Sequence, residues 1–232
     1  MNTKNRWLIA LSAVGIHISI GSVYAWSVFT KPLQQEMGWG LKQISFTFSL
    51  AILFLGLSAA FLGHFVEKYG PRAAGTLSAV FFGVGVAGAG FAIQVESLLL
   101  LYLFYGMIAG IGLGVGYITP VSTLVKWFPD RRGLATGLAI MGFGFASLIS
   151  SPIMNHLIVN YGISNTFYLL GAAFFIIIFC SAQYLAPPEA GWVPKGIEAA
   201  GQKSERMKVK KDLRQLTANE AVRTRQFWAL WL

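Results

Sequence analysis

The chain has 232 residues, of which 55% are hydrophobic and only 12% are charged. A soluble domain normally carries about 25% charged residues, so this composition excludes an ordinary water-soluble domain and indicates a protein that folds in lipid. The net charge of +9 does not indicate nucleic-acid binding, because nine of the 18 Lys and Arg residues lie between Lys195 and Arg225 and the others cluster at the ends of apolar runs.

Six apolar runs are long enough to cross a hydrocarbon core, which takes about 20 helical residues. They lie near residues 7–29, 44–66, 73–95, 98–120, 134–158 and 163–186. The first run is too long for the core of a signal peptide and lacks a small-residue cleavage site, so it is predicted to be an uncleaved helix. The sequence thus predicts an all-α membrane protein whose first domain, residues 1–186, is a six-helix transmembrane bundle.

Lysine and arginine are divided unequally between the two sides of this predicted bundle. Seven of them lie in the N-terminal tail and in the loops near residues 67–72 and 126–132, whereas the opposite side carries only Lys31 and Lys42. Cytoplasmic loops are enriched in Lys and Arg. The N-terminus and the long basic segment after residue 186 are therefore predicted to be cytoplasmic, in an inner or plasma membrane.

The first predicted helix is the most polar of the six. His17 lies ten residues after Trp7, which places it about 15 Å deep, near the middle of the bilayer. An ionisable residue there is a candidate for substrate binding, and a neutral imidazole bonded to a nearby hydroxyl group is the structural alternative. Tyr24 shares the face of His17, whereas Trp26 points roughly the opposite way. His17, Tyr24 and Trp26 are our candidate substrate-binding residues in this helix.

The same helix carries the most specific motif of the chain. Residues 21–29 read Gly-Ser-Val-Tyr-Ala-Trp-Ser-Val-Phe, followed by Pro-Leu at 32–33 and Glu-Met-Gly-Trp at 36–39. This stretch resembles the first helix of the oxalate/formate antiporter family, a carboxylate-transporting branch of the major facilitator superfamily. Helix packing offers no obvious reason for the order Tyr-Ala-Trp-Ser to recur.

A short charged segment, residues 63–72, separates the second and third apolar runs. It resembles the cytoplasmic signature between helices 2 and 3 of the major facilitator superfamily, with Glu where the family usually has Asp. The matching residues, predicted to form a conformational signature, are Gly63, Glu67, Lys68, Gly70 and Arg72. Gly63 would permit close helix approach, Gly70 can adopt a positive φ, and Pro71 suits the first position of the next helix. An ordinary turn would explain the Gly-Pro pair but not the order of the charges.

Small residues dominate the third to fifth apolar runs. Packing explains the five glycines of the third run completely. The fourth run is predicted to be the least regular helix, because five glycines precede its closing Pro120, and interrupted helices often mark the binding site of a transporter. Tyr117 in this run is the fourth candidate substrate-binding residue. Many proton-coupled relatives carry an Arg near the place of Gly106, so a proton relay of that kind is not indicated here.

The loop after the fourth run and the fifth run itself extend the resemblance. Residues 126–137, which read Lys-Trp-Phe-Pro-Asp-Arg-Arg-Gly-Leu-Ala-Thr-Gly, also resemble the antiporter family. The fifth run carries a stripe of Gly, Ser and Pro between Gly142 and Pro152 that either lines a cavity or packs against a neighbouring helix.

After residue 186 the composition changes abruptly to Pro, Gly, Lys, Glu and Gln. Residues 187–225 are predicted to be a solvated cytoplasmic linker. Residues 217–220, Thr-Ala-Asn-Glu, have the form of a capping box and predict a helix start. Residues 226–232 would begin a seventh membrane helix, which leads us to expect a chain that continues into a second bundle.

No catalytic constellation is evident in the sequence, so no enzyme activity and no cofactor are predicted. The single Cys180 excludes an internal disulfide, and the three histidines lie on different helices or at different depths, so no metal site is predicted. The resemblance implies a twelve-helix transporter with a site between its halves, and small carboxylates of the oxalate, formate, lactate or pyruvate type as substrates. The expected partners are that substrate, the lipid bilayer and a missing second six-helix half, with no nucleic acid.

Three alternatives stay open. One is a major facilitator transporter for another solute, such as a sugar or a drug. Another is a truncated or scaffolding membrane fragment that transports nothing, and the last is a half-transporter that works as a homodimer. No predicted span has an interior Lys or Arg, so the chain offers an anion only aromatic and hydroxyl groups, with His17 as a possible donor.

Overall fold

The computed structural model describes residues 4–189, 192 and 224, and every regular element in them is helical. The helices are α1 (Arg6–Gly21), the 3₁₀ turn η1 (Ser22–Ala25), α2 (Ser27–Met37), α3 (Leu41–Gln94), α4 (Leu98–Leu101), the π-helical η2 (Tyr102–Ala109), α5 (Gly110–Trp127), α6 (Arg132–Gly144), α7 (Ala146–Tyr161) and α8 (Ile163–Tyr184). The chain divides into two compact units, residues 1–192 and 193–232, and the helices all belong to the first. The predicted helix start at 217–220 and the predicted seventh helix at 226–232 lie outside the described residues.

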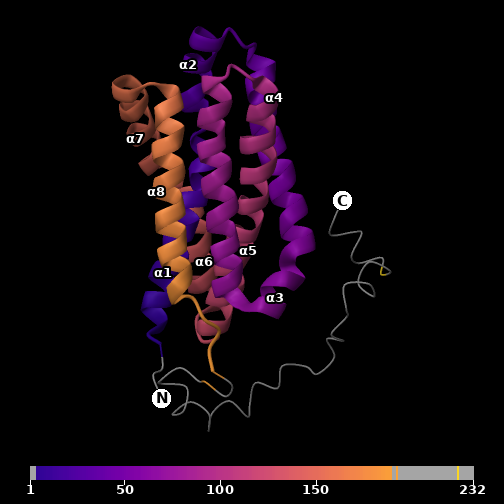
Figure 1. The fold of residues 1–232 in the computed structure, drawn as a ribbon. Helices are drawn as coiled ribbons and strands as arrows, with labels where there is room; N and C mark the ends of the chain where they lie inside the picture. Colours follow the sequence, from indigo (N-terminus) through magenta and orange to yellow (C-terminus); the bar gives the residue numbers. More distant parts are fainter. Residues whose placement is uncertain (1–3, 190–191, 193–223, 225–232) are drawn as a thin grey trace. The chain divides into compact units, whose positions relative to one another are not determined.

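The described chain crosses the bundle six times (Figure 1). In chain order the crossings are α1 with η1, the part of α3 before Gly70, the part of α3 after it, α4 with η2 and α5, α6 with α7, and α8. Five continuous helical segments are long and apolar enough to span a membrane, and one of them, α3, has 54 residues. At 1.5 Å per residue α3 would be about 81 Å long, far more than the ~30 Å of a hydrocarbon core. It is divided at Gly70, whose φ of 80° and ψ of 169° are not helical. The prediction of an all-α, six-crossing membrane bundle is confirmed.

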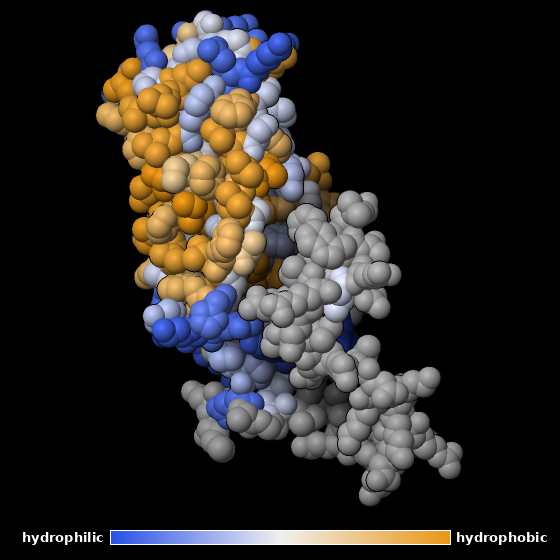
Figure 2. Space-filling model, turned by 90° about the vertical axis from the view of Figure 1, so that its right-hand side faces the viewer, coloured by the Kyte–Doolittle hydropathy of each residue, from blue (hydrophilic) through white to orange (hydrophobic). Residues whose placement is uncertain are grey.

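The surface of the bundle agrees with a membrane environment. Figure 2 shows a broad hydrophobic belt between two hydrophilic ends. Many large apolar side chains of the bundle are exposed, among them Phe61, Leu99, Leu148 and Val159, each at least 70% exposed. Lipid or another apolar protein surface satisfies such a belt, and water does not.

Local sequence explains where several helices begin. The Oδ1 atom of Asn5 accepts a hydrogen bond from the backbone N–H of Trp7 at 2.9 Å and caps α1. Ser97 caps α4 in the same way, its Oγ accepting from the backbone N–H of Leu100 at 3.4 Å. Short polar side chains at these positions satisfy N–H groups that the first helical turn leaves free.

Small residues set the distances between the helices, as the sequence predicted for the third run. A Cβ atom added at Gly75 would lie 2.7 Å from the Cβ of Ala182, and one at Gly83 would lie 2.7 Å from the Cβ of Phe175. The helix that follows Gly70 therefore packs directly on α8. In lipid there is no hydrophobic drive between helices, so this close van der Waals contact is what holds them together.

Two predicted features of the fourth crossing are placed differently by the structure. Its irregular part is the π-helical η2, which contains only the first of the five glycines, Gly106, and the glycines from Gly110 onward lie in a regular α-helix. The apolar run near 98–120 ends at Pro120, whereas α5 continues to Trp127. A proline removes one hydrogen bond, and packing inside a bundle tolerates that loss. The helix ends just before Phe128 and Pro129 instead.

Candidate functional site

The second half of the first crossing is built around a tight turn that presents Tyr24. The hydroxyl groups of Ser19 and Ser22 donate hydrogen bonds to the carbonyl oxygens of Gly15 and Ser19, at 2.9 and 2.6 Å. Such bonds bend helices, and here α1 tightens into η1 at Ser22. Tyr24 lies within η1 and its side chain is 49% exposed.

The absence of a side chain at Gly21 lets this turn touch the fifth crossing. A Cβ atom there would collide with the carbonyl oxygen of Phe143 and lie 2.7 Å from the Cβ of Ala146. Helix α6 ends at Gly144 and α7 begins at Ala146, so the contact falls where the fifth crossing is interrupted. The close approach brings the ring of Phe143 beside the rings of the first crossing.

Phe143 is the centre of an aromatic cluster that joins three of the candidate residues. Its ring makes edge-to-face contacts with Tyr24 at 5.2 Å, Tyr117 at 5.3 Å and His17 at 6.0 Å between centroids. His17 and Tyr117 are stacked, with centroids 5.7 Å apart and an interplanar angle of 28°. These distances and angles are the ones that aromatic pairs prefer. We call these four residues the aromatic site.

Two members of the aromatic site, Tyr117 and His17, lie deep in the bundle. Tyr117 precedes Lys126 by nine residues and His17 follows Trp7 by ten, so both lie about 14–15 Å from the same end. That depth is close to the middle of a hydrocarbon core. The phenol hydroxyls of Tyr24 and Tyr117 have no hydrogen-bond partner within the described part of the chain, and both side chains are partly exposed. They are free to donate to, or accept from, a bound solute.

His17 occupies the inner side of the aromatic site and has no exposed surface. Its Nδ1 atom lies 2.8 Å from the carbonyl oxygen of Ala139, and its Nε2 atom lies 3.2 Å from the carbonyl oxygen of Tyr117. The ring therefore links α1 to α6 and α5 through backbone atoms, and not through a hydroxyl group as the structural alternative supposed. A solute that reached the aromatic site would meet Tyr24 and Tyr117 before it met His17.

Trp26 belongs to a different cluster. Its side chain is only 5% exposed, its Nε1 donates a hydrogen bond to the carbonyl oxygen of Ile44 at 3.2 Å, and its ring lies 4.4 Å from that of Tyr105. Phe29 and Phe167 complete this packing. Tyr24 and Trp26 thus have different ring partners, although α-helical spacing does not hold in the 3₁₀ turn between them. The two side chains still share one pocket of about 270 Å³, which Ser27, Thr30, Ser45 and Phe48 also line.

The charged segment at residues 63–72 forms the turn inside α3, and we call the end of the bundle where it lies the hinge end. Gly70 adopts the predicted positive φ, and Pro71 begins the next helical stretch. The prediction for Gly63 is wrong within the described bundle, because a Cβ atom there would have nothing within 4 Å. A helix could approach Gly63 closely only if it came from outside the six described crossings.

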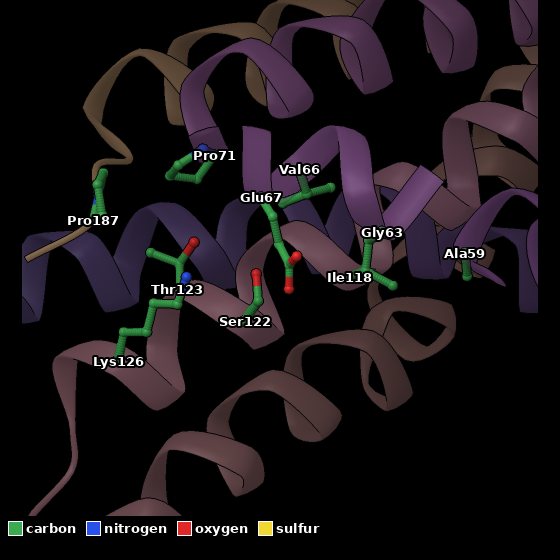
Figure 3. Close-up of a pocket in the computed structure, with 10 residues that line it drawn as sticks. All are labelled: Ala59, Gly63, Val66, Glu67, Pro71, Ile118, Ser122, Thr123, Lys126 and Pro187. Atoms are coloured by element: carbon green, nitrogen blue, oxygen red, sulfur yellow. The ribbon is translucent and has the colours of Figure 1, made fainter. Parts of the chain in front are cut away.

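Glu67 and Gly63 line a pocket of about 210 Å³ at the hinge end, between α3 and α5 (Figure 3). Hydroxyl and cationic side chains from α5, namely Ser122, Thr123 and Lys126, face it as well. No ion pair joins Glu67 to any residue that the structure describes. The remaining signature residues point elsewhere: Lys68 lies over the ring of Tyr69 at 5.2 Å, and Arg72 Nε donates to Gln183 Oε1 at 2.7 Å.

A network of polar contacts gathers the other hinge-end segments. Arg6 and Asp130 form an ion pair of 3.1 Å whose side chains are 20% and 18% exposed. The Nε1 atom of Trp127 donates to the carbonyl oxygen of Ala186 at 2.7 Å, and its ring lies 4.8 Å from that of Trp192. The N-terminal segment, the loop between α5 and α6, and the residues after α8 are thereby held together. The N-terminal segment, the segment 63–72 and the loop 126–132, which the sequence assigns to one side, do lie at one end of the bundle.

Sequence reasoning missed Phe143 and Asp130. Phe143 is one of 18 phenylalanines in an apolar chain, and nothing in its spacing distinguishes it from a lipid-facing ring. Asp130 was visible as an acid within the basic loop 126–132, but its partner Arg6 is 124 residues away. Among the described residues, no three His, Cys, Asp or Glu side chains lie close enough together to hold a metal ion.

Comparison with known proteins gives a family and several relatives. Residues 10–232 match the family model described as Major Facilitator Superfamily. The chain is 30% identical over 229 residues to the "Oxalate:formate antiporter" of Oxalobacter formigenes, which covers 98% of this chain and 51% of that protein. It is 29% identical over 229 residues to the "Uncharacterized MFS-type transporter YhjX" of Escherichia coli (strain K12), covering 98% and 53%. "Monocarboxylate transporter 14" of Mus musculus is 27% identical over 177 residues, covering 76% and 34%. The chain thus spans about half the length of the first two relatives.

Proposed function

Because this chain belongs to the major facilitator superfamily, whose members are transporters and not enzymes, we propose that it supplies one six-helix half of a secondary transporter for small carboxylates. The bundle would present the aromatic site to the solute, and a second bundle would complete the binding site. Alternating access would then follow from rocking of the two halves about that site, as parallel repeats in transporters allow.

The observation that carries this proposal is the pair of phenol groups that meet at Phe143. Tyr24 and Tyr117 converge on Phe143 with ring contacts of 5.2 and 5.3 Å, and neither hydroxyl has a partner among the described residues. A carboxylate leaving water needs hydrogen-bond donors to replace its hydration. Two phenols beside aromatic walls suit a small, flat anion better than they suit a sugar, which needs both donors and acceptors around its ring.

The names of the relatives support the same substrate class. Two of them are named for oxalate and formate exchange and for monocarboxylate transport, and the first of these aligns with 98% of this chain. Within the described crossings no Lys or Arg lies in the membrane interior, so this half offers weak binding by itself. We assign solute contact to Tyr24 and Tyr117, a position behind them to His17, and a supporting position to Trp26.

Equilibrium binding of radiolabelled oxalate to the chain in liposomes tests the proposal. Replacement of either phenol, as Tyr24→Phe or Tyr117→Phe, removes one hydrogen bond to a charged group. Such a bond contributes about 1.5–3 kcal/mol, so the dissociation constant should rise at least about tenfold. Tyr161→Phe is the matched control, because Tyr161 is 56% exposed and lies in none of the ring contacts of the aromatic site.

Two results would overturn the proposal. One is the absence of saturable oxalate binding by a chain that is helical and inserted in the membrane. The other is equal binding by the three phenylalanine variants, which would make both phenols ordinary packing residues. A preference for an uncharged sugar over oxalate would reassign the substrate class within the same family.

A further inference from the structure

The two ring nitrogens of His17 both face hydrogen-bond acceptors. Nδ1 lies 2.8 Å from the carbonyl oxygen of Ala139, and Nε2 lies 3.2 Å from that of Tyr117. A backbone carbonyl oxygen accepts hydrogen bonds and never donates them. Both contacts are therefore hydrogen bonds only when both nitrogens carry a proton, which is the imidazolium form.

The neutral ring can keep only one of these bonds. The shorter contact, to Ala139, is the one it would retain, with the proton on Nδ1. The lone pair of Nε2 would then point at the carbonyl oxygen of Tyr117, and the two would repel each other. Loss of a proton from Nε2 thus loosens the contact between α1 and α5 at Tyr117, while the contact between α1 and α6 remains.

The surroundings of the ring hold no fixed counter-charge. From α5 the group that faces it is the phenol of Tyr117, and from α6 the neighbours are Ala139, Gly142 and Phe143. Helices α7 and α8 also pack on α1; they carry no Asp, Glu, Lys or Arg, and their histidine, His156, is exposed. The ends of α1, α5 and α6 carry the cations Arg6, Lys126 and Arg132, far along the sequence from His17.

Burial without a counter-charge opposes the imidazolium, whereas two hydrogen bonds from a charged donor favour it. These opposing effects are what a reversible proton site requires. They also make the charge of His17 sensitive to a new charge nearby. A carboxylate bound against Tyr117 would be such a charge, separated from the imidazole by a ring whose centroid lies 5.7 Å away.

We infer that His17 is a proton-binding site linked to solute binding at the other members of the aromatic site. A proton on Nε2 holds the backbone of Tyr117 in place, and a carboxylate bound against Tyr117 favours that proton. The inference rests on the proposed function for its carboxylate. When His17 is protonated, it supplies a positive charge in the membrane interior, where the described crossings have no Lys or Arg. The ligand is a proton from the aqueous phase, taken up as imidazole becomes imidazolium. By linkage, each ligand raises the affinity of the other by the same factor.

Nitrogen NMR of the chain with ¹⁵N-labelled histidine, in liposomes, tests the proton site directly. As the pH is raised in a titration, the His17 signals should change from those of imidazolium to those of the neutral ring protonated at Nδ1. His64 and His156 are exposed and serve as internal references, and His17→Gln identifies the His17 signals. Added oxalate should move the His17 transition to higher pH. A neutral ring throughout the titration, with and without oxalate, would overturn the inference.

Oxalate binding measured against pH gives the second readout. For one linked proton the affinity falls by up to about tenfold per pH unit above the transition. His17→Gln keeps an N–H donor but cannot take up a proton, so its oxalate affinity should change less than about twofold over the same range. His156→Gln is the matched control and should behave as the unaltered chain does.

The two readouts separate this inference from the proposed function. Saturable oxalate binding with a permanently neutral His17 would overturn the proton site and leave the transporter proposal standing. Titration of His17 without any oxalate binding would overturn the proposed function, and with it the linkage, while the proton site itself would remain. A His17→Gln variant whose oxalate binding keeps its full pH dependence would also overturn the inference.

Discussion

The contact between the third and fourth crossings at Gly112 gives the sharpest prediction about the fold. A Cβ atom at Gly112 would collide with the backbone nitrogen of Phe82 and would lie 2.9 Å from its Cα and 3.0 Å from the carbonyl carbon of Phe81. Carbon atoms in favourable contact are about 3.5–4.0 Å apart. All three obstacles are backbone atoms, so no side chain can turn aside, and Gly112→Ala must push the two helices apart.

The expected cost follows from a comparison with Gly56→Ala. A Cβ atom at Gly56 has nothing within 4 Å, and Gly56 also lies inside a membrane helix. Both substitutions gain the same helix propensity, about 1 kcal/mol, so the difference between them isolates the steric term. Overpacking of this kind costs about 1–3 kcal/mol. Gly112→Ala should therefore be less stable than Gly56→Ala by that amount.

Reversible unfolding in mixed detergent micelles, followed by circular dichroism, measures this difference. The free energy of unfolding should be lower for Gly112→Ala, and Gly56→Ala should equal or exceed the unaltered chain. Equal stability of the two variants would refute the reasoning, because it would mean that the helices are not in backbone contact at Gly112.

Three further substitutions test separate parts of the account. Trp26→Phe removes the hydrogen bond to the carbonyl oxygen of Ile44. This should cost about 1 kcal/mol of unfolding free energy and leave oxalate affinity nearly unchanged. A larger loss of affinity than of stability would place Trp26 in the binding site. Asp130→Asn breaks the ion pair with Arg6, which is partly exposed, so the unfolding free energy should fall by no more than about 1 kcal/mol, and 1 M salt should abolish the difference. Arg72→Ala removes the contact with Gln183 at the hinge end. In transport assays this variant should slow solute turnover and leave oxalate affinity intact. A selective loss of affinity would contradict the interpretation of residues 63–72 as a conformational signature.

The membrane architecture could be predicted from the sequence because its determinants are local. Runs of about 20 apolar residues specify a crossing wherever they occur. The turn inside α3 was predictable for the same reason, since Gly70 can adopt a φ of 80° at little cost and Pro71 has no N–H to lose at the start of a helix.

The arrangement of the site depends on contacts between distant segments and could be predicted only in part. His17 stood out because an ionisable group is rare at membrane depth, but its two carbonyl partners, 100 and 122 residues away, carry no sequence signal. Phe143 reaches the site because Gly21 lets two helices touch, and that contact follows from the packing of the whole bundle. Helix α5 continues past Pro120, where the apolar run ends, because packing in a bundle tolerates the hydrogen bond that a proline removes.

The measurement that tests the central claim most directly is displacement of labelled oxalate from the chain in liposomes by unlabelled formate, lactate, pyruvate and glucose. The account predicts that the carboxylates displace oxalate and that glucose does not, because Tyr24 and Tyr117 offer hydrogen bonds suited to a small anion. Displacement by glucose as effective as that by formate would contradict the claim that this six-helix half presents a carboxylate site.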